Sequence, residues 1–194
     1  TCSLVDQSMA AALEPGSVAM LNYALRVSFV PLMLGETAIA TTAPYFSKMI
    51  ALANWKGVRH TLYSFLKLIF LITVPLTGFL LFLSEPIIQV LFQRGAFTAQ
   101  QTHLVAQVFS AFVLQIPFYI SGNLVVKLLT CLSLNPILMW VSLFNVSINV
   151  GLNYLFMQYL GIQGIALSTS CVYLFSFLFV LCFALKNLKK FSMV

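Results

Sequence analysis

The chain has 194 residues, of which 61% are hydrophobic and only 7% charged, whereas an ordinary soluble domain is about half apolar and about a quarter charged. This composition excludes a water-soluble globule and predicts that lipid covers most of the surface. The net charge of +6 does not indicate binding of nucleic acid, because the basic residues lie between apolar segments and not together on one solvated face.

We expect an all-α polytopic membrane protein, with a single transmembrane lobe over 1–194 built from one truncated and five complete helices. The truncated helix is expected over 1–13 and ends at the turn signal Glu14-Pro15-Gly16. The complete helices are expected over 17–50, 61–92, 103–129, 137–159 and 163–185, followed by a basic tail over 186–194. Internal Pro and Gly residues predict kinks. The incomplete first helix indicates a piece of a longer protein.

The basic residues of the loops predict the orientation in the membrane, because Lys and Arg are retained on the cytoplasmic side during insertion. Alternate loops separate clearly, and the other side offers only Arg94. The basic side carries Lys48, Lys56, Arg59, Lys127, Lys186, Lys189 and Lys190. We therefore expect this side, and the C-terminus of the chain, to be cytoplasmic. Each of these residues is also explained by topology or by contact with lipid headgroups alone.

Charged groups within the membrane segments are candidates for function, because a charge near the bilayer centre is costly unless it faces protein or water. Arg26 lies nine residues into its expected helix, roughly 14 Å from the start at ~1.5 Å per residue. Asn22 lies one turn earlier on the same face. Glu36 lies ten residues beyond Arg26, too far along and around the helix to pair with it directly. Arg26 either pairs with a carboxylate inside the bundle or contacts a substrate.

A polar stripe runs along the fifth expected helix, and Gln163 with Ser168-Thr169-Ser170 forms a matching face on the last one. The stripe consists of Ser142, Asn145, Asn149 and Asn153, at spacings of three and four residues. Such amides often act only as packing hydrogen bonds between membrane helices. Together with Asp6, the oxygens of these two helices also provide what a hard monovalent cation requires.

The sequence does not indicate an enzyme. It contains neither a Ser/His/Asp constellation, nor a phosphate-binding loop, nor a pair of catalytic carboxylates, and its two histidines lie near loops. The four cysteines form no Cys-x-x-Cys motif and lie apart from the histidines, so they predict neither a zinc site nor a disulfide framework. No cofactor is expected from these residues.

Several motifs, in the same order along the chain, resemble the MurJ (MviN) lipid II flippases of the MOP superfamily. They are Leu21-Asn22-Tyr23-Ala24-Leu25-Arg26, Pro44-Tyr45-Phe46-Ser47, Leu91-Phe92-Gln93-Arg94-Gly95-Ala96-Phe97, Gln115-Ile116-Pro117-Phe118-Tyr119 and Gly161-Ile162-Gln163-Gly164-Ile165-Ala166-Leu167-Ser168-Thr169-Ser170. The resemblance covers nearly the whole chain. It implies the second lobe of a two-lobed transporter, with the N-terminal lobe as a missing partner.

The resemblance also implies roles for particular residues. Arg26 matches a cavity arginine that engages the pyrophosphate of the lipid-linked substrate. Where the family often carries a Glu three residues later, this chain has Phe29, and Glu36 is the candidate replacement. The positions that bind sodium in some members correspond to Asp6, Asn149, Asn153, the Ile165 carbonyl and Thr169. Because sodium-binding relatives carry a carboxylate at the position of Asn153, we expect weak sodium binding.

The function that we expect is therefore translocation of undecaprenyl-linked peptidoglycan precursor across the bacterial cytoplasmic membrane by alternating access. The partners would be this anionic lipid-linked substrate, the membrane lipids and the missing lobe. A related polysaccharide-lipid flippase or a multidrug exporter is the alternative within transport, because a shared fold does not separate these activities. A non-transporting membrane scaffold is the alternative outside transport.

Overall fold

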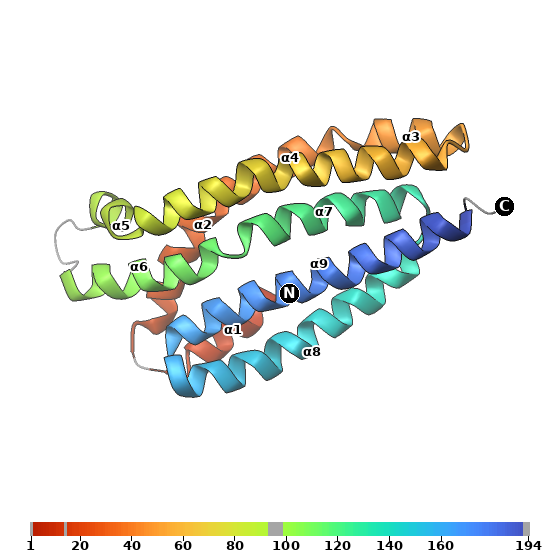
Figure 1. The fold of residues 1–194 in the computed structure, drawn as a ribbon. Coiled ribbons are helices and arrows are strands. Elements are labelled where there is room, and N and C mark those ends of the chain that lie inside the picture. Colours follow the sequence, from red (N-terminus) through yellow and green to blue (C-terminus); the bar gives the residue numbers. More distant parts are fainter. Residues whose placement is uncertain (1, 14, 93–98, 192–194) are drawn as a thin grey trace.

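The computed structural model describes residues 2–13, 15–92 and 99–191, and over these residues the protein folds into helices without β-strands (Figure 1). The expected all-α fold is thereby confirmed. The polar loop expected around Arg94, and Glu14 in the first turn, lie outside the described residues. The helices are α1 Cys2–Ala10, α2 Ser17–Ala40, α3 Ala43–Ala51, α4 Trp55–Phe82, α5 Ser84–Phe92, α6 Ala99–Val113, α7 Ile116–Cys131, α8 Asn135–Leu160 and α9 Ile162–Phe191.

Within the described residues, five stretches are long and apolar enough to cross a membrane, as expected from the sequence. They are Ser17–Ala51, Trp55–Phe82, Ala99–Cys131, Asn135–Leu160 and Ile162–Lys190. Two of them consist of consecutive helices, because α3 continues the direction of α2 and α7 that of α6 (Figure 1). The chain is therefore a multi-pass helical membrane protein, with the short α1 in addition to the five spans.

The prolines act differently from one helix to the next. Helix α2 continues through Pro31, whereas Pro44 and Pro117 lie in the first turns of α3 and α7, where the missing N–H leaves no hydrogen bond unmade. The expected segments 17–50 and 103–129 are therefore each divided between two helices.

Two other segments also differ from the expected bounds. Helix α4 begins at Trp55, six residues before the expected start of its segment, because the Asn54 side chain caps it by accepting a hydrogen bond from the Gly57 N–H at 2.9 Å. The same segment is divided after Phe82, where α4 ends and α5 begins two residues later. Helix α9 continues as far as Phe191, so most of the expected basic tail is helical.

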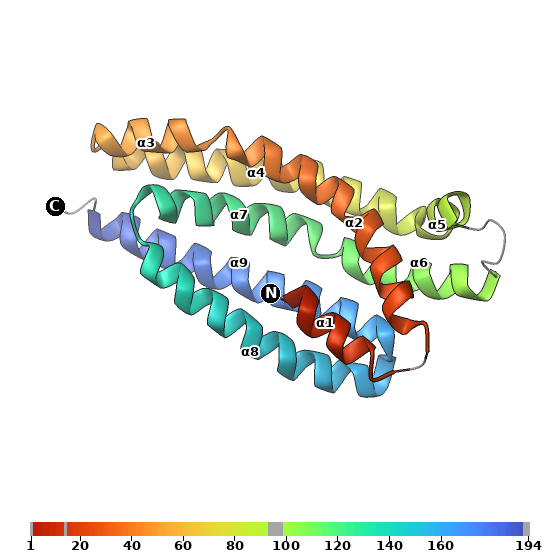
Figure 2. The ribbon, with the colours of Figure 1, turned by 180° about the vertical axis from the view of Figure 1, so that it is seen from behind.

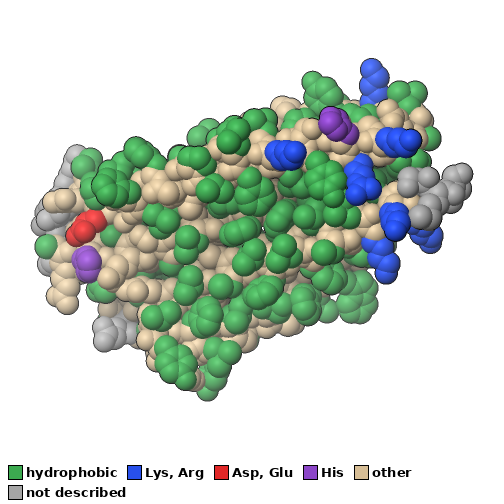
Figure 3. All heavy atoms as spheres, in the orientation of Figure 1, with side chains coloured by type: hydrophobic (Ala, Val, Ile, Leu, Met, Phe, Trp, Pro, Cys, Tyr) green, Lys and Arg blue, Asp and Glu red, His purple; other side chains and the backbone are tan. Residues whose placement is uncertain are grey.

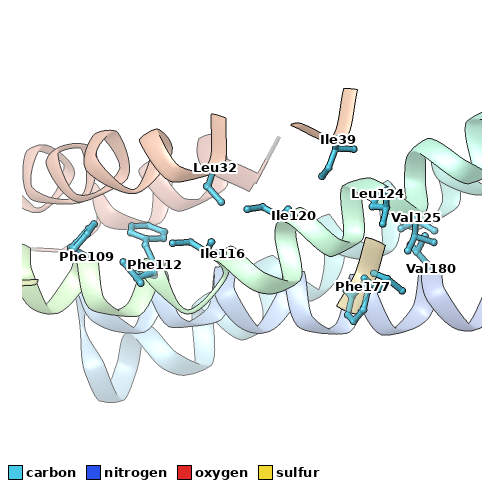
Figure 4. Close-up of a cluster of buried hydrophobic side chains, with 14 of the residues drawn as sticks. Leu32, Ile39, Phe109, Phe112, Ile116, Ile120, Leu124, Val125, Phe177 and Val180 are labelled. Carbon is cyan, nitrogen blue, oxygen red and sulfur yellow. The ribbon is translucent and has the colours of Figure 1, made fainter. Parts of the chain in front are cut away.

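Helix α9 lies at the centre of the packing, in contact with α6, α7 and α8. Helices α4, α7 and α9 run side by side, and α2 crosses one face of the bundle to pack on α6 and α7 (Figures 1 and 2). Helix α1 packs against α8 and α9 on that same face (Figure 2). The buried side chains shared by these helices include Leu32, Ile39, Phe109, Phe112, Ile116, Ile120, Leu124, Val125, Phe177 and Val180 (Figure 4).

The outer surface of the bundle is apolar, as a lipid-facing surface must be. Large side chains such as Phe82 and Tyr159 are exposed by more than four fifths, at 85% and 84%. In Figure 3 the hydrophobic side chains cover the length of the visible face, while most of the visible Lys and Arg side chains gather at the end that carries α3. This distribution fits an apolar body whose charged end reaches the membrane surface.

Candidate functional site

A pocket of about 400 Å³, with both polar and apolar side chains in its lining, opens beside Arg26, between α1, α2, α7 and α9. It is lined by Ser3, Asp6, Leu25, Arg26, Phe29, Leu32, Gln115, Tyr119, Thr169 and Tyr173. Arg26 is exposed in this chain, on a helix that otherwise buries apolar side chains such as Leu21 and Ala24 in the core. The pocket, which we call the arginine pocket, therefore carries a cation within a candidate membrane span.

Arg26 has no ion-pair or hydrogen-bond partner among the described residues. Asp6 lines the same pocket, but its carboxylate is engaged by two neutral side chains and forms no ion pair with Arg26. The interpretation that Arg26 pairs with a carboxylate of the bundle therefore finds no support within the part of the chain that the structure describes. The guanidinium remains available to a ligand in the pocket.

The structure places Asn22 and Glu36 outside the lining of the arginine pocket. Asn22 Oδ1 accepts a hydrogen bond from Gln7 Nε2 at 3.1 Å and thereby ties α2 to α1. Glu36 accepts hydrogen bonds from the Tyr119 hydroxyl and, at 3.5 Å, from Asn123 Nδ2 on α7. Because Tyr119 also lines the pocket, Glu36 reaches the arginine pocket only through that tyrosine.

The five residues expected to form a cation site do come together, where α1, α8 and α9 meet. Asp6 Oδ1 accepts a hydrogen bond from Asn153 Nδ2 at 2.7 Å, and Asp6 Oδ2 accepts one from the Thr169 hydroxyl at 3.0 Å. Asn153 Nδ2 also approaches Asn149 Oδ1 at 3.3 Å, and Thr169 Oγ1 approaches the Ile165 carbonyl at 3.1 Å. We call these five residues the Asp6 cluster.

Ser168, which the sequence places on the polar face of the last expected helix, contacts the Asp6 cluster as well. Its hydroxyl contacts Asn153 Oδ1 and donates to the Ile165 carbonyl at 2.8 Å. Asp6, Asn149, Asn153 and Ser168 are each at most 1% exposed. The whole arrangement is therefore buried at the junction of three helices.

The donor set of the Asp6 cluster fits a small hard cation better than a transition metal, because its ligand atoms are carboxylate, amide, hydroxyl and carbonyl oxygens. Among the described residues no group of three or more His, Cys, Asp or Glu side chains forms a metal site. Asp6 is the single carboxylate of the cluster, and its partners are neutral. The amide of Asn153 presents its nitrogen to Asp6, so binding a cation there requires this amide to turn its oxygen inward.

Gln115, Tyr119 and Tyr173 also line the arginine pocket, although the sequence does not predict a site at these residues. Gln115 and Tyr119 are four residues apart at the start of α7, which places them on one face of that helix. This spacing, continued by Asn123, is the signal that was available in the sequence. The spacing alone does not predict a site, because the sequence does not show which face of α7 is turned toward α2 and α9.

Five candidate membrane spans, a pocket that is lined by a cation, and the buried Asp6 cluster together define a class of protein. The chain is a multi-pass α-helical membrane protein with a polar interior face, of the kind that transport proteins use. A sequence model of the family described as "Lipid II flippase MurJ" matches residues 2–193. The chain belongs to this family.

Individual relatives agree with the family assignment. The chain is 32% identical over 163 residues to a probable lipid II flippase MurJ of Synechocystis sp., covering 84% of this chain and 31% of that protein. It is 29% identical over 167 residues to the corresponding protein of Rickettsia prowazekii, covering 86% of this chain and 33% of the relative. The chain thus spans about a third of the length of these curated relatives.

The fold also matches a solved structure, described as lipid II flippase MurJ in an inward closed conformation. The match has a TM-score of 0.83 at 27% sequence identity, and it covers 99% of this chain and 42% of the solved one. The helical arrangement of this chain is therefore that of a part of a MurJ protein.

Proposed function

We propose that the chain is the second lobe of a flippase that moves a lipid-linked, pyrophosphate-bearing peptidoglycan precursor across the bacterial cytoplasmic membrane. The observation that carries the proposal is Arg26, a cation without a protein partner among the described residues, on the wall of the arginine pocket within a candidate membrane span. Membership of a family whose members are named lipid II flippases supplies the substrate class.

The chemistry of Arg26 suits a pyrophosphate. A guanidinium is planar and always charged, and it donates two parallel hydrogen bonds to neighbouring phosphate oxygens. Keeping such a group within the membrane is costly, so the ligand that it binds is expected to carry negative charge. Leu25, Phe29 and Leu32 contribute apolar side chains to the same pocket, and an apolar surrounding strengthens a charge-assisted hydrogen bond.

Replacing Arg26 tests the proposal. In the full-length protein, Arg26→Ala is expected to abolish growth of a strain depleted of its own lipid II flippase, while the protein remains present in the membrane. Arg26→Lys is expected to rescue poorly, because a point charge does not reproduce the bidentate geometry. The matched control is Lys67→Ala, which removes an exposed cation from α4, away from the lining of the pocket.

The outcomes separate the alternatives. Normal growth of the Arg26→Ala strain would remove Arg26 from the mechanism and favour a non-transporting scaffold. Loss of growth together with loss of the protein from the membrane would assign Arg26 a structural role. A related polysaccharide-lipid flippase or a multidrug exporter has no specific observation in its favour.

We also propose that the Asp6 cluster is a weak sodium site. The support is the buried Asp6 carboxylate, which has only neutral partners among the described residues, and the neutral amide, hydroxyl and carbonyl groups that meet beside it. Leaving a carboxylate ionised in such a place is costly without a counter-charge. A bound sodium ion would supply that charge, and a sodium gradient is a source of free energy for transport.

Asn153→Asp tests the sodium site, because it adds a second carboxylate beside Asp6, where an opposite charge is attracted far more strongly than in water. Sodium, compared with potassium at equal concentration, is expected to raise the melting temperature of the full-length protein, and to raise it more in Asn153→Asp than in the unaltered protein. The control is Asn145→Asp, which adds the same charge to α8 outside the Asp6 cluster. Identical melting of Asn153→Asp in both salts would leave the asparagines as packing hydrogen bonds.

A further inference from the structure

A second pocket of about 240 Å³ adjoins the arginine pocket and lies between α7, α8 and α9. The two pockets share Tyr119 and Tyr173, whose rings pack edge to face with centroids 4.9 Å apart. Its polar lining consists of Tyr119, Asn123, Ser142, Asn145, Tyr173 and Ser176. We call it the amide pocket, after Asn123 and Asn145.

No charged side chain lines the amide pocket within the part of the chain that the structure describes. Asn145 Nδ2 donates to Ser176 Oγ at 2.9 Å, and Asn123 Nδ2 donates to Glu36 at 3.5 Å. The amide oxygens of Asn123 and Asn145 accept no hydrogen bond from the described residues. These two acceptors, one in each of two candidate membrane spans, thus have no hydrogen-bond donor among the residues that the structure describes.

Such a lining suits a neutral ligand that is rich in hydroxyl and amide groups. Polar groups of a ligand that are withdrawn from water must find hydrogen-bond partners in the protein. The amide oxygens of Asn123 and Asn145 and the Ser176 hydroxyl offer such partners without selecting for charge. The tyrosine rings add flat apolar faces with a polar tip. The arginine pocket has the opposite preference, because it contains a free guanidinium.

We propose that the amide pocket is a second subsite, which binds the neutral hydroxyl- and amide-bearing part of the same headgroup whose anionic part Arg26 binds. This inference rests on the proposed function. The shared Tyr119–Tyr173 pair places the two subsites side by side, so a headgroup with a charged end and a neutral end contacts both. The lobe then distinguishes a complete headgroup from the bare lipid pyrophosphate.

Two lipids separate the subsites in a binding experiment on the purified full-length protein: lipid II, and undecaprenyl pyrophosphate, which lacks the disaccharide and the peptide. Asn145→Leu and Asn123→Leu remove an amide of nearly the same size and are each expected to weaken lipid II binding about five- to tenfold. Undecaprenyl pyrophosphate binding is expected to change less than about twofold. Arg26→Gln is expected to weaken the binding of both lipids.

Ser147→Ala is the matched control, because Ser147 lies on α8 outside the lining of both pockets and its hydroxyl donates to the Leu143 carbonyl of its own helix at 3.0 Å. Lipid II binding by this variant is expected to stay unchanged. If both asparagine variants lose the two lipids in equal proportion, or lose neither, the amide pocket is not a subsite, and the proposed function stands. If the unaltered protein binds neither lipid, the proposed function fails, and the subsite fails with it.

Discussion

Among the described residues, two that are not glycine adopt a left-handed backbone conformation where helices end. Ala53 follows α3 with φ 50°, and Ser133 follows α7 with φ 58°. In both turns the next residue donates its N–H back into the helix, from Asn54 to the Met49 carbonyl and from Leu134 to the Leu129 carbonyl, each at 3.0 Å. This is the hydrogen bond of a Schellman helix end, which most often has glycine at the left-handed position.

Glycine at these positions is therefore expected to stabilise the protein. Ala53→Gly and Ser133→Gly each remove a steric cost of about 1–2 kcal/mol for a left-handed residue, offset in part by the greater freedom of glycine in the unfolded chain. We expect a net gain of about 0.5–1 kcal/mol for each, measured as a higher melting temperature in detergent. The control is Ala38→Gly, at an exposed position inside α2, which should lower stability by a similar amount. A lower melting temperature of both turn variants would contradict this account.

The residues of the Asp6 cluster could be predicted from the sequence because two separate signals agreed. Asn149 and Asn153 are one turn apart on an otherwise apolar helix, and the motif around Thr169 resembled the family. The tyrosine pair could not be predicted in this way. Tyr119 and Tyr173 are far apart in the sequence, and aromatic residues are as typical of a lipid-facing surface as of a site.

At the scale of helices, the apolar segments and the presence of kinks could be predicted, but not which of the prolines coincide with the end of a helix. The division at residues 41–42 follows from Pro44 in the first turn of α3, while Pro31 lies inside α2 without ending it. A proline in a membrane helix is tolerated where neighbouring helices satisfy the freed carbonyl. The sequence does not state which prolines have such neighbours, because that depends on how the helices pack.

The hairpin of α8 and α9 depends on a close approach at Gly164. A Cβ atom on this residue would overlap the carbonyl group of Phe156 in α8 and lie 3.0 Å from the Met157 nitrogen. Asn153 lies one turn before Phe156, and Ser168 lies one turn after Gly164, and these two side chains are in contact. The absence of a side chain at Gly164 therefore lets α8 and α9 meet closely enough to form the Asp6 cluster.

Gly164→Ala is expected to destabilise the protein by about 1–3 kcal/mol, as overpacking against a rigid backbone does. The matched control is Gly151→Ala, because no heavy atom lies within 4 Å of a Cβ built at that position in α8. This control should raise stability by about 0.5–1 kcal/mol, since alanine is the better helix former. Thermal melting of both variants measures the difference. Equal melting of the two would mean that the hairpin does not need a glycine at residue 164.

At the scale of the whole molecule, charge is distributed unevenly between the two ends of the bundle. Seven of the ten Lys and Arg residues belong to α3, the start of α4, the end of α7 or the end of α9. These four regions lie at one end of the bundle (Figure 1), where most of the visible basic side chains gather (Figure 3). The fold thus brings together basic residues that the sequence distributes over several connections. An asymmetry of this kind orients a helical membrane protein with its basic end in the cytoplasm.

Cysteine labelling tests this orientation in the full-length protein. With Cys2, Cys131, Cys171 and Cys182 replaced by alanine or serine, new cysteines are introduced singly at exposed positions near the ends of the spans. Ser133→Cys and Leu52→Cys lie at the basic end, whereas Gln100→Cys lies in the first turn of α6 at the other end. A maleimide that does not cross membranes should label Gln100→Cys in intact spheroplasts, and the other two only after the membrane is opened. The physical reason is that translocating the basic connections during insertion is disfavoured. Labelling of Ser133→Cys in intact spheroplasts would reverse the orientation, and would place the basic end of the bundle outside the cytoplasm.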